Sequence, residues 1–150
     1  THPTGAPIVV DYAHTPDALK NILLSLRPHV KGKLVCVFGA GGDRDKEKRS
    51  LMGKVASVLA DITIVTDDNP RSESPLAIRE EIMKGCPLAQ NVGGRSEAIS
   101  LGLSNLSDGD LLVIAGKGHE TCQEIGGTII PFNDAAFVKA RLNDVVERVQ

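Results

Sequence analysis

The sequence predicts a doubly wound α/β fold, a Rossmann-like arrangement in which helices cover both faces of a mostly parallel sheet. β-rich and helical segments alternate along nearly the whole chain, two strand candidates are continuous apolar runs, and two helices begin with a capping residue followed by proline. Continuous apolar runs are typical of strands buried on both faces of a parallel sheet. A strand–helix alternation of this kind predicts parallel crossover units.

The first strand–helix unit is marked at its junction. The β-rich run Pro7–Tyr12 is followed by Thr15 and Pro16, which predict an N-cap and a first-turn proline for a helix over Asp17–His29. Apolar side chains recur on one stripe of that helix, as packing against a sheet requires: Leu19, Ile22, Leu23 and Leu26.

The next two units follow the same order. Lys33–Phe38 is a nearly continuous apolar run, and the glycine-rich loop Gly39–Asp45 separates it from a helix that extends to about Leu59. Asp61–Thr66 is the third strand, and Ser74-Pro75 repeats the pattern of a cap and a first-turn proline.

In the second half, a weak strand near Asn91-Val92, a helix from about Arg95 to Leu106 and the strong strand Asp110–Ala115 complete the alternation. The C-terminal part differs. The β-rich stretches Thr121–Ile125 and Thr128–Phe132 flank two glycines, which is the signal of a two-residue hairpin turn. We therefore expect an antiparallel hairpin at the C-terminal edge of the sheet.

A last amphipathic helix ends the predicted order of elements. Asn133 or Asp134 is expected to cap it, since both side chains can accept a hydrogen bond from the first helical turn. Its apolar positions recur at helical spacing: Phe137, Val138, Leu142, Val145, Val146 and Val149.

Length and composition narrow the class of protein. Residues 1–150 are expected to form one domain. The net charge of -2 and the aromatic content of 3% argue against a nucleic-acid partner, because neither a basic field nor stacking platforms are available. No apolar run reaches the roughly 20 residues of a membrane span and no leader opens the chain. Three widely spaced cysteines favour a reducing cytoplasm.

The candidate site residues lie in four loops that follow predicted strands, where ligands gather in such sheets. In the first loop, Asp11 could bind a ribose and His14 could face a phosphate, although a capped turn with a solvated histidine explains both as well. In the second, glycines from Gly39 to Gly42 would let backbone N–H groups approach an anion near Arg44. A surface cluster of ion pairs is the alternative.

The third and fourth loops carry complementary charges. Arg71 has a planar fork for a carboxylate, while Asp68 and Asn69 offer acceptors for an ammonium group. Glu120 follows Gly116 in the fourth loop and could pair with a cation. Together these groups could hold the zwitterionic head of an amino acid. The structural alternatives are an Asx-type turn and a glycine-rich connection with solvated charges.

Two more classes of function also fit parts of the pattern. Gly39 and Gly41 follow a strand and an aspartate lies some two dozen residues on, as in a nicotinamide-dependent oxidoreductase domain. Arg44 stands where the third glycine of that pattern belongs, which argues against it. A stand-alone amino-acid sensor is the second such class, and it would bind its ligand without any ATPase.

Four strings in this order and spacing resemble the C-terminal domain of the Mur ligases, in their diaminopimelate-adding branch, over essentially the whole chain. They are DYAHTPD (Asp11–Asp17), GGDRDK (Gly41–Lys46), DNPR (Asp68–Arg71) and GKGHE (Gly116–Glu120). DNPR is the most specific, because its arginine accompanies diaminopimelate selection in this family.

The resemblance implies an ATP-dependent, amide-forming ligase of peptidoglycan synthesis. ATP would phosphorylate the γ-carboxylate of UDP-N-acetylmuramoyl-L-alanyl-D-glutamate, and the amine of meso-2,6-diaminopimelate would attack the acyl phosphate. By position, Asp11 and His14 would face the nucleotide. The residues that would bind diaminopimelate are Arg44, Asp68, Asn69, Arg71, Gly116 and Glu120.

Further parts of the machinery do not occur in this sequence. The family's phosphate-binding loop, Mg²⁺ ligands and modified lysine belong to a central domain, its UDP-sugar site largely to an N-terminal one, and no GxxxxGK[ST] motif occurs here. We therefore expect a domain without catalytic residues, metal site or ligase activity of its own. A lysine-adding ligase of the same family is the alternative. Arg71 argues against it, because lysine has no distal carboxylate.

Overall fold

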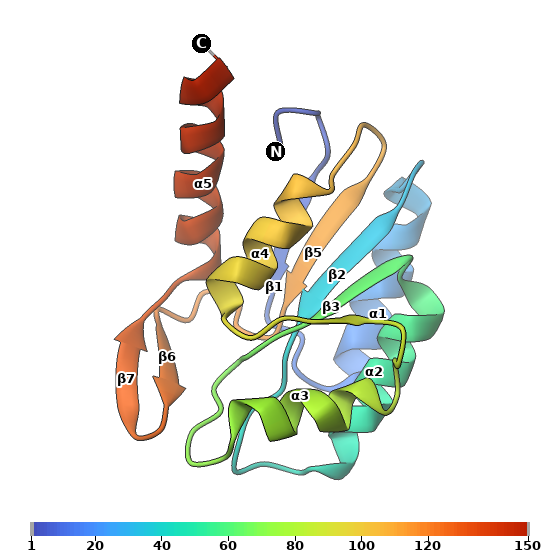
Figure 1. Cartoon of the computed structure of the whole chain (residues 1–150). Coiled ribbons are helices and arrows are strands. Elements are labelled where there is room, and N and C mark those ends of the chain that lie inside the picture. Colours follow the sequence, from blue (N-terminus) through green and yellow to red (C-terminus); the bar gives the residue numbers. More distant parts are fainter. Residues whose placement is uncertain (1, 150) are drawn as a thin grey trace.

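Five parallel strands form the central sheet of the computed structural model, which describes residues 2–149 and, in the last helix, side chains only as far as residue 143 (Figure 1). The strand order is β1-β5-β2-β3-β4, so the predicted doubly wound fold is confirmed. The strands are β1 (Ile8–Asp11), β2 (Leu34–Phe38), β3 (Ile62–Val65), β4 (Gln90–Asn91) and β5 (Leu111–Ala115).

Helices cover both faces of the sheet. They are α1 (Pro16–Leu26), the short 3₁₀ helix η1 (Arg27–His29), α2 (Glu47–Leu59), α3 (Pro75–Met83), α4 (Arg95–Ser104) and α5 (Asp134–Val149). Helices α1, α2 and α3 pack on one face, whereas α4 and the start of α5 pack on the other. Alternate side chains of β2 serve the two cores: Leu34, Cys36 and Phe38 face α1–α3, while Val35 and Val37 face α4.

Local signals placed the helix starts well. The side chains of Thr15 and Ser74 accept hydrogen bonds from the first turns of α1 and α3, as predicted. The first helix ends at Leu26 rather than at His29, and continues only as η1. Pro28 explains the difference, because it lacks the N–H that the next α-helical hydrogen bond needs.

Cys36 is a core residue, as expected. It is fully buried in the centre of β2, and this burial raises the pKa of its thiol to about 12. Cys86 is buried on the same side of the sheet, and desolvation raises its pKa to about 11. Both thiols therefore stay protonated and unreactive at neutral pH.

The predicted antiparallel hairpin is confirmed, but its place differs from the expected one. Strands β6 (Cys122–Ile125) and β7 (Thr128–Pro131) form a separate two-stranded antiparallel sheet and do not extend the edge of the central sheet. Figure 1 shows the hairpin beside the loop after β3, to which a single bridge between Arg71 and Ile125 connects it. The hairpin pairs with this loop because the loop offers a free backbone N–H and C=O at Arg71.

The last helix begins as predicted. Asn133 Oδ1 accepts a hydrogen bond from Ala136 N at 2.8 Å and is the cap, which leaves the carboxylate of Asp134 for a tertiary contact. Phe137, Val138 and Leu142 pack into the core that α4 covers. The predicted apolar positions 145, 146 and 149 lie outside the residues whose side chains are described. None of the helices within residues 2–149 has the length and apolar character of a membrane span.

Candidate functional site

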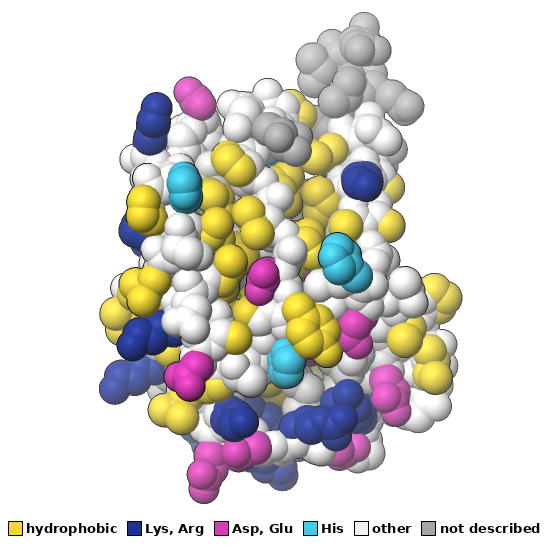
Figure 2. All heavy atoms as spheres, turned by 180° about the vertical axis from the view of Figure 1, so that it is seen from behind, with side chains coloured by type: hydrophobic (Ala, Val, Ile, Leu, Met, Phe, Trp, Pro, Cys, Tyr) yellow, Lys and Arg dark blue, Asp and Glu magenta, His cyan; other side chains and the backbone are white. Residues whose placement is uncertain are grey.

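A cavity of about 410 Å³ opens at the carboxyl edge of the sheet, where the loops after parallel strands meet. All four loops singled out in the sequence contribute to its lining. Of the eight predicted site residues, only Asp11 does not line it. Charged side chains of both signs gather at this end of the molecule, which lies lowest in Figures 1 and 2.

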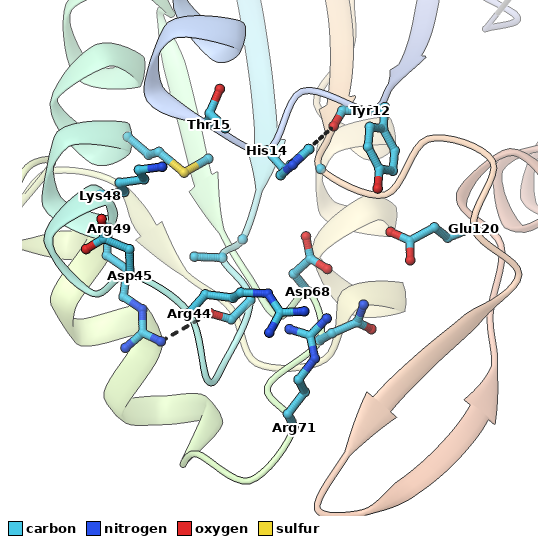
Figure 3. Close-up of a pocket in the computed structure, with 16 residues that line it drawn as sticks. Tyr12, His14, Thr15, Arg44, Asp45, Lys48, Arg49, Asp68, Arg71 and Glu120 are labelled. Carbon is cyan, nitrogen blue, oxygen red and sulfur yellow. Dashed lines mark hydrogen bonds between the residues drawn. The ribbon is translucent and has the colours of Figure 1, made fainter.

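The loop between β1 and α1 forms one wall of the cavity. Asp11 Oδ2 accepts a hydrogen bond from Ala13 N at 2.9 Å, so this carboxylate stabilises the loop locally. His14 Nδ1 lies 3.0 Å from Tyr12 O, and because a carbonyl only accepts, Nδ1 is the donor and Nε2 stays available. The rings of Tyr12 and His14 pack edge to face with centroids 4.8 Å apart (Figure 3).

The glycines after β2 allow two loops to pack against each other. A Cβ on Gly39 would lie 2.4 Å from Thr66 O, and one on Gly42 would lie 1.8 Å from Pro70 O. Gly42 N donates to Asn69 O at 2.7 Å, so this N–H is not free for an anion as the sequence had suggested. The side on which a Cβ of Gly39 or Gly42 would lie is thus filled by the loop after β3, so both glycines serve the packing of these two loops.

The hairpin fixes the backbone of Arg71. Its φ of 52° lies in the left-handed region, which is unusual for a side chain of this size. Two backbone hydrogen bonds hold it there, from Arg71 N to Glu124 O at 2.9 Å and from Gly126 N to Arg71 O at 2.7 Å. The guanidinium group then spans the cavity wall, with Nη1 donating to Gly42 O at 2.9 Å and Nε 3.6 Å from Glu124 Oε2.

Charges of both signs converge in the cavity. Figure 3 shows Arg44 and Arg71 pointing toward its centre with Asp68, while Glu120 points in from the loop after β5. Asp68 is only 6% exposed, yet no described residue donates a hydrogen bond to its carboxylate or pairs with it. Its oxygens are not among the fully buried polar atoms that lack a partner, so they are accessible from the cavity, and Asp68 is a candidate to receive a ligand cation. Gly116 admits this carboxylate, since a Cβ there would lie 2.7 Å from Asp68 Oδ2.

The acceptor role expected for Asn69 is wrong. Asn69 Oδ1 already accepts two hydrogen bonds, from Lys117 Nζ at 3.2 Å and from Glu124 N at 3.0 Å. Both lone-pair positions of this oxygen are therefore used, and the side chain presents its NH₂ group instead. Lys117 is fully buried, so the structural alternative of solvated charges does not apply to it.

Sequence reasoning missed the arginine that braces the glycine-rich loop. Arg49 is 1% exposed and donates to Gly41 O at 3.1 Å, to both carboxylate oxygens of Glu73 at 2.6 and 3.1 Å, and to Glu81 at 2.9 Å. The hydrogen bonds from Arg49 are the main cause that lowers the pKa of Glu73 to about 2. Its position could have been noticed, because Arg49 lies on the apolar stripe of α2 with Met52 and Ala56.

A second missed arginine joins the strand ends below the cavity. Arg95 and Asp134 form a two-pronged ion pair, with both distances 2.7 Å and both side chains fully buried. Arg95 also donates to Asp67 O at 3.0 Å and to Ala115 O at 3.2 Å. It therefore ties α5 to the carbonyls just before Asp68 and Gly116. Nothing in the local pattern distinguishes Arg95 from an ordinary first-turn residue of α4.

A model of the family described as "Mur ligase, glutamate ligase domain" matches residues 1–118 of this sequence. The chain belongs to the Mur ligase family. Family membership replaces the oxidoreductase interpretation. Two alternatives stay open within the family. A lysine-adding ligase would bind a different amino acid, and an amino-acid sensor would bind its ligand without forming an amide.

Two curated relatives of this Mur ligase domain carry the same name. UDP-N-acetylmuramoyl-L-alanyl-D-glutamate--2,6-diaminopimelate ligase from Caulobacter vibrioides is 55% identical over 143 residues, which is 95% of this chain and 29% of the relative. The enzyme of that name from Brucella melitensis is 56% identical over 138 residues, which is 92% of this chain and 28% of the relative. The chain thus spans less than a third of these relatives.

Solved structures agree. A structure of UDP-N-acetylmuramoyl-L-alanyl-D-glutamate--2,6-diaminopimelate ligase superposes with a TM-score of 0.87 at 43% identity and covers 91% of this chain and 29% of that one. A bifunctional folylpolyglutamate synthase/dihydrofolate synthase superposes with a TM-score of 0.61 at 19% identity, covering 77% of this chain and 27% of that one. At this low identity, the second match supports the fold alone.

Proposed function

We propose that this Mur ligase domain binds meso-2,6-diaminopimelate and delivers its amine to UDP-N-acetylmuramoyl-L-alanyl-D-glutamate in an ATP-dependent ligase of peptidoglycan synthesis. The observation that carries the proposal is the mixed charge of one cavity, with two guanidinium groups, Arg44 and Arg71, and two carboxylates, Asp68 and Glu120. A ligand with two amino-acid heads needs both signs. The names of the relatives support the same ligand.

The charges suggest a role for each group. Arg71 and the NH₂ group of Asn69 lie two residues apart on one loop and would bind the carboxylate of the distal, D-configured end. Asp68 and Glu120, with the Gly116 backbone, would receive ammonium groups. Arg44 would bind a carboxylate, because its guanidinium group makes only one described hydrogen bond, to Asp43 O at 3.2 Å.

His14 and Asp11 are proposed to face the nucleotide from the other wall. As an imidazolium, His14 would donate from Nδ1 to Tyr12 O and from Nε2 to a phosphate oxygen, whereas Asp11 lies at the end of β1 and does not line the cavity. Within the described residues, no three His, Cys, Asp or Glu side chains lie close enough together to hold a metal ion. As the family resemblance implies, we propose that a central domain of such a ligase, rather than this domain, binds Mg²⁺ and makes most of the contacts with ATP.

The proposed reaction passes through an acyl phosphate. When bound, ATP supplies the phosphoryl group that activates the D-glutamate carboxylate, and this domain holds the attacking amine in place. The chain alone is proposed to be inactive, since its described residues orient an amino acid but offer no phosphate-binding loop. Release of ADP by the isolated chain, given all substrates, would contradict this part of the proposal.

Arg71 separates diaminopimelate from lysine in this proposal. Lysine would leave the partly buried guanidinium group without the distal carboxylate of the ligand, and a lost hydrogen bond to a charged group costs about 1.5–3 kcal/mol. In the full-length ligase, Arg71→Ala should therefore lower kcat/KM for meso-diaminopimelate by about 100-fold. Arg27→Ala is the control, because Arg27 pairs with Asp61 next to the start of β3, at the other end of the sheet.

An NMR titration of the chain itself tests the ligand directly. Backbone amide shifts of Arg44, Asp68–Arg71 and Gly116–Glu120 should respond to meso-diaminopimelate and much less to L-lysine. An equal response to lysine would favour the lysine-adding alternative. Tight binding in the absence of any ATPase, with no amide formation in the full-length protein, would favour an amino-acid sensor.

A further inference from the structure

Lys117 has an unusual environment for a residue between two glycines. Its side chain is fully buried, and Nζ donates to Cys122 O at 2.6 Å and to Asn69 Oδ1 at 3.2 Å. Among the described residues, no carboxylate forms an ion pair with it. Burying an amino group is costly, so its contacts to one backbone carbonyl and one side-chain amide need an explanation.

The contacts of Lys117 decide the orientation of the Asn69 amide. Two donors face the Asn69 amide: the amino group of Lys117 and the backbone N–H of Glu124. Both require an acceptor, and within the amide only the oxygen accepts. Rotating the amide by 180° would place its NH₂ group against two donors. The NH₂ group of Asn69 consequently points away from Lys117, in a side chain that lines the cavity together with Arg71.

We infer that Lys117 is a positioning residue, which holds the Asn69 amide so that its NH₂ group acts with Arg71 on the carboxylate of the ligand. The identity of that ligand rests on the proposed function, whereas the orientation of the amide does not. Lys117 also ties this amide to β6, the strand whose Glu124 O accepts from the backbone N–H of Arg71. One strand of the hairpin therefore sets both carboxylate donors.

Asn69→Asp separates positioning from folding. The aspartate keeps an oxygen for Lys117 and for Glu124 N, and adds a negative charge next to the buried amine, so the melting temperature should not fall. Its second oxygen replaces the NH₂ group and repels the ligand carboxylate. The KM of the full-length ligase for meso-diaminopimelate should rise about 10-fold or more, with a smaller change in kcat. An unchanged KM would overturn the inference.

Lys117→Met tests the lysine itself, with Lys31→Met as the matched control, because Lys31 is exposed in the loop before β2 at the opposite end of the sheet. In the ligand-free chain, Lys117→Met should shift the side-chain NH₂ resonances of Asn69, and Lys31→Met should not. Unchanged Asn69 resonances in Lys117→Met would overturn the inference, whatever amino acid the full-length protein uses. Failure of the full-length protein to use diaminopimelate would refute the proposed function and leave the inference about the amide standing.

A double-mutant cycle in the full-length ligase completes the test. If Lys117 acts through Asn69, the variant with Asn69→Ala and Lys117→Met should raise the KM for meso-diaminopimelate no more than Asn69→Ala alone. Independent, multiplicative losses would show that Lys117 acts by another route and would overturn the inference.

Discussion

The cavity has a first wall, made by the loops after β2 and β3, and a second wall, made by the loop after β1, and the two walls are built differently. The loops after β2 and β3 hold each other through contacts between residues distant in sequence, such as the hydrogen bonds of Arg49 with Glu73 and of Arg71 with Gly42. The loop after β1 depends on contacts within itself, since Ala13 N donates to Asp11 and His14 donates to the carbonyl of Tyr12, a residue that is 57% exposed.

This difference matches two kinds of task. A site that distinguishes two similar amino acids needs hydrogen-bond donors held at fixed positions, because a guanidinium group displaced from the ligand carboxylate no longer favours the amino acid that carries it. A wall that meets a nucleotide held mainly by another domain can stay exposed and adjust on contact. The structure therefore leads us to expect that changes in the first wall alter both stability and selectivity, and that changes in the second alter activity alone.

The largest effect is expected below the first wall. Asp134→Ala would leave Arg95 buried without its ion-pair partner, and breaking such a pair costs about 3–5 kcal/mol. Urea unfolding of the chain should show this loss in the free energy of unfolding. Asp17→Ala is the control from the other wall: Asp17 is exposed in the first turn of α1, so less than about 1 kcal/mol should be lost. Equal losses would remove the contrast between the walls.

A somewhat smaller effect is expected from acid. Because hydrogen bonds from Arg49 lower the pKa of Glu73 from 4.5 to about 2, its stabilisation is fully present above about pH 4.5. It is lost as the pH falls from 4.5 toward 2, and amounts to about 3 kcal/mol. Urea unfolding between pH 6 and pH 2.5 should show this slope, and Glu73→Gln should flatten it. A slope unchanged in that variant would assign the acid sensitivity to other carboxylates.

The smallest effect on stability is expected in the second wall. His14→Ala removes a hydrogen bond that stays within its own loop, so the free energy of unfolding should change by no more than about 0.5 kcal/mol. In the full-length ligase the same change should raise the KM for ATP several-fold, measured by ADP release. A large loss of stability without a change in the KM for ATP would reverse the roles given to the two walls.

The sequence by itself determined the order of elements and the end of the sheet where the site lies. Apolar periodicity and caps such as Thr15 and Ser74 act over a few residues, so the strands and helix starts can be predicted locally. Because all five strands of the central sheet are parallel, placing the four loops at one edge follows from topology alone. Seven of the eight candidate residues consequently line one cavity.

Only the tertiary structure decided how those residues are oriented. The left-handed backbone of Arg71 and the orientation of the Asn69 amide depend on a hairpin about 50 residues farther along the chain, and the buried amino group of Lys117 joins that hairpin to Asn69. Hydrogen bonds of this kind leave no periodic trace in the sequence, because each satisfies a single donor or acceptor that folding would otherwise bury unpaired. Residue type thus predicted which charges meet, and packing determined which atoms of each group face the ligand.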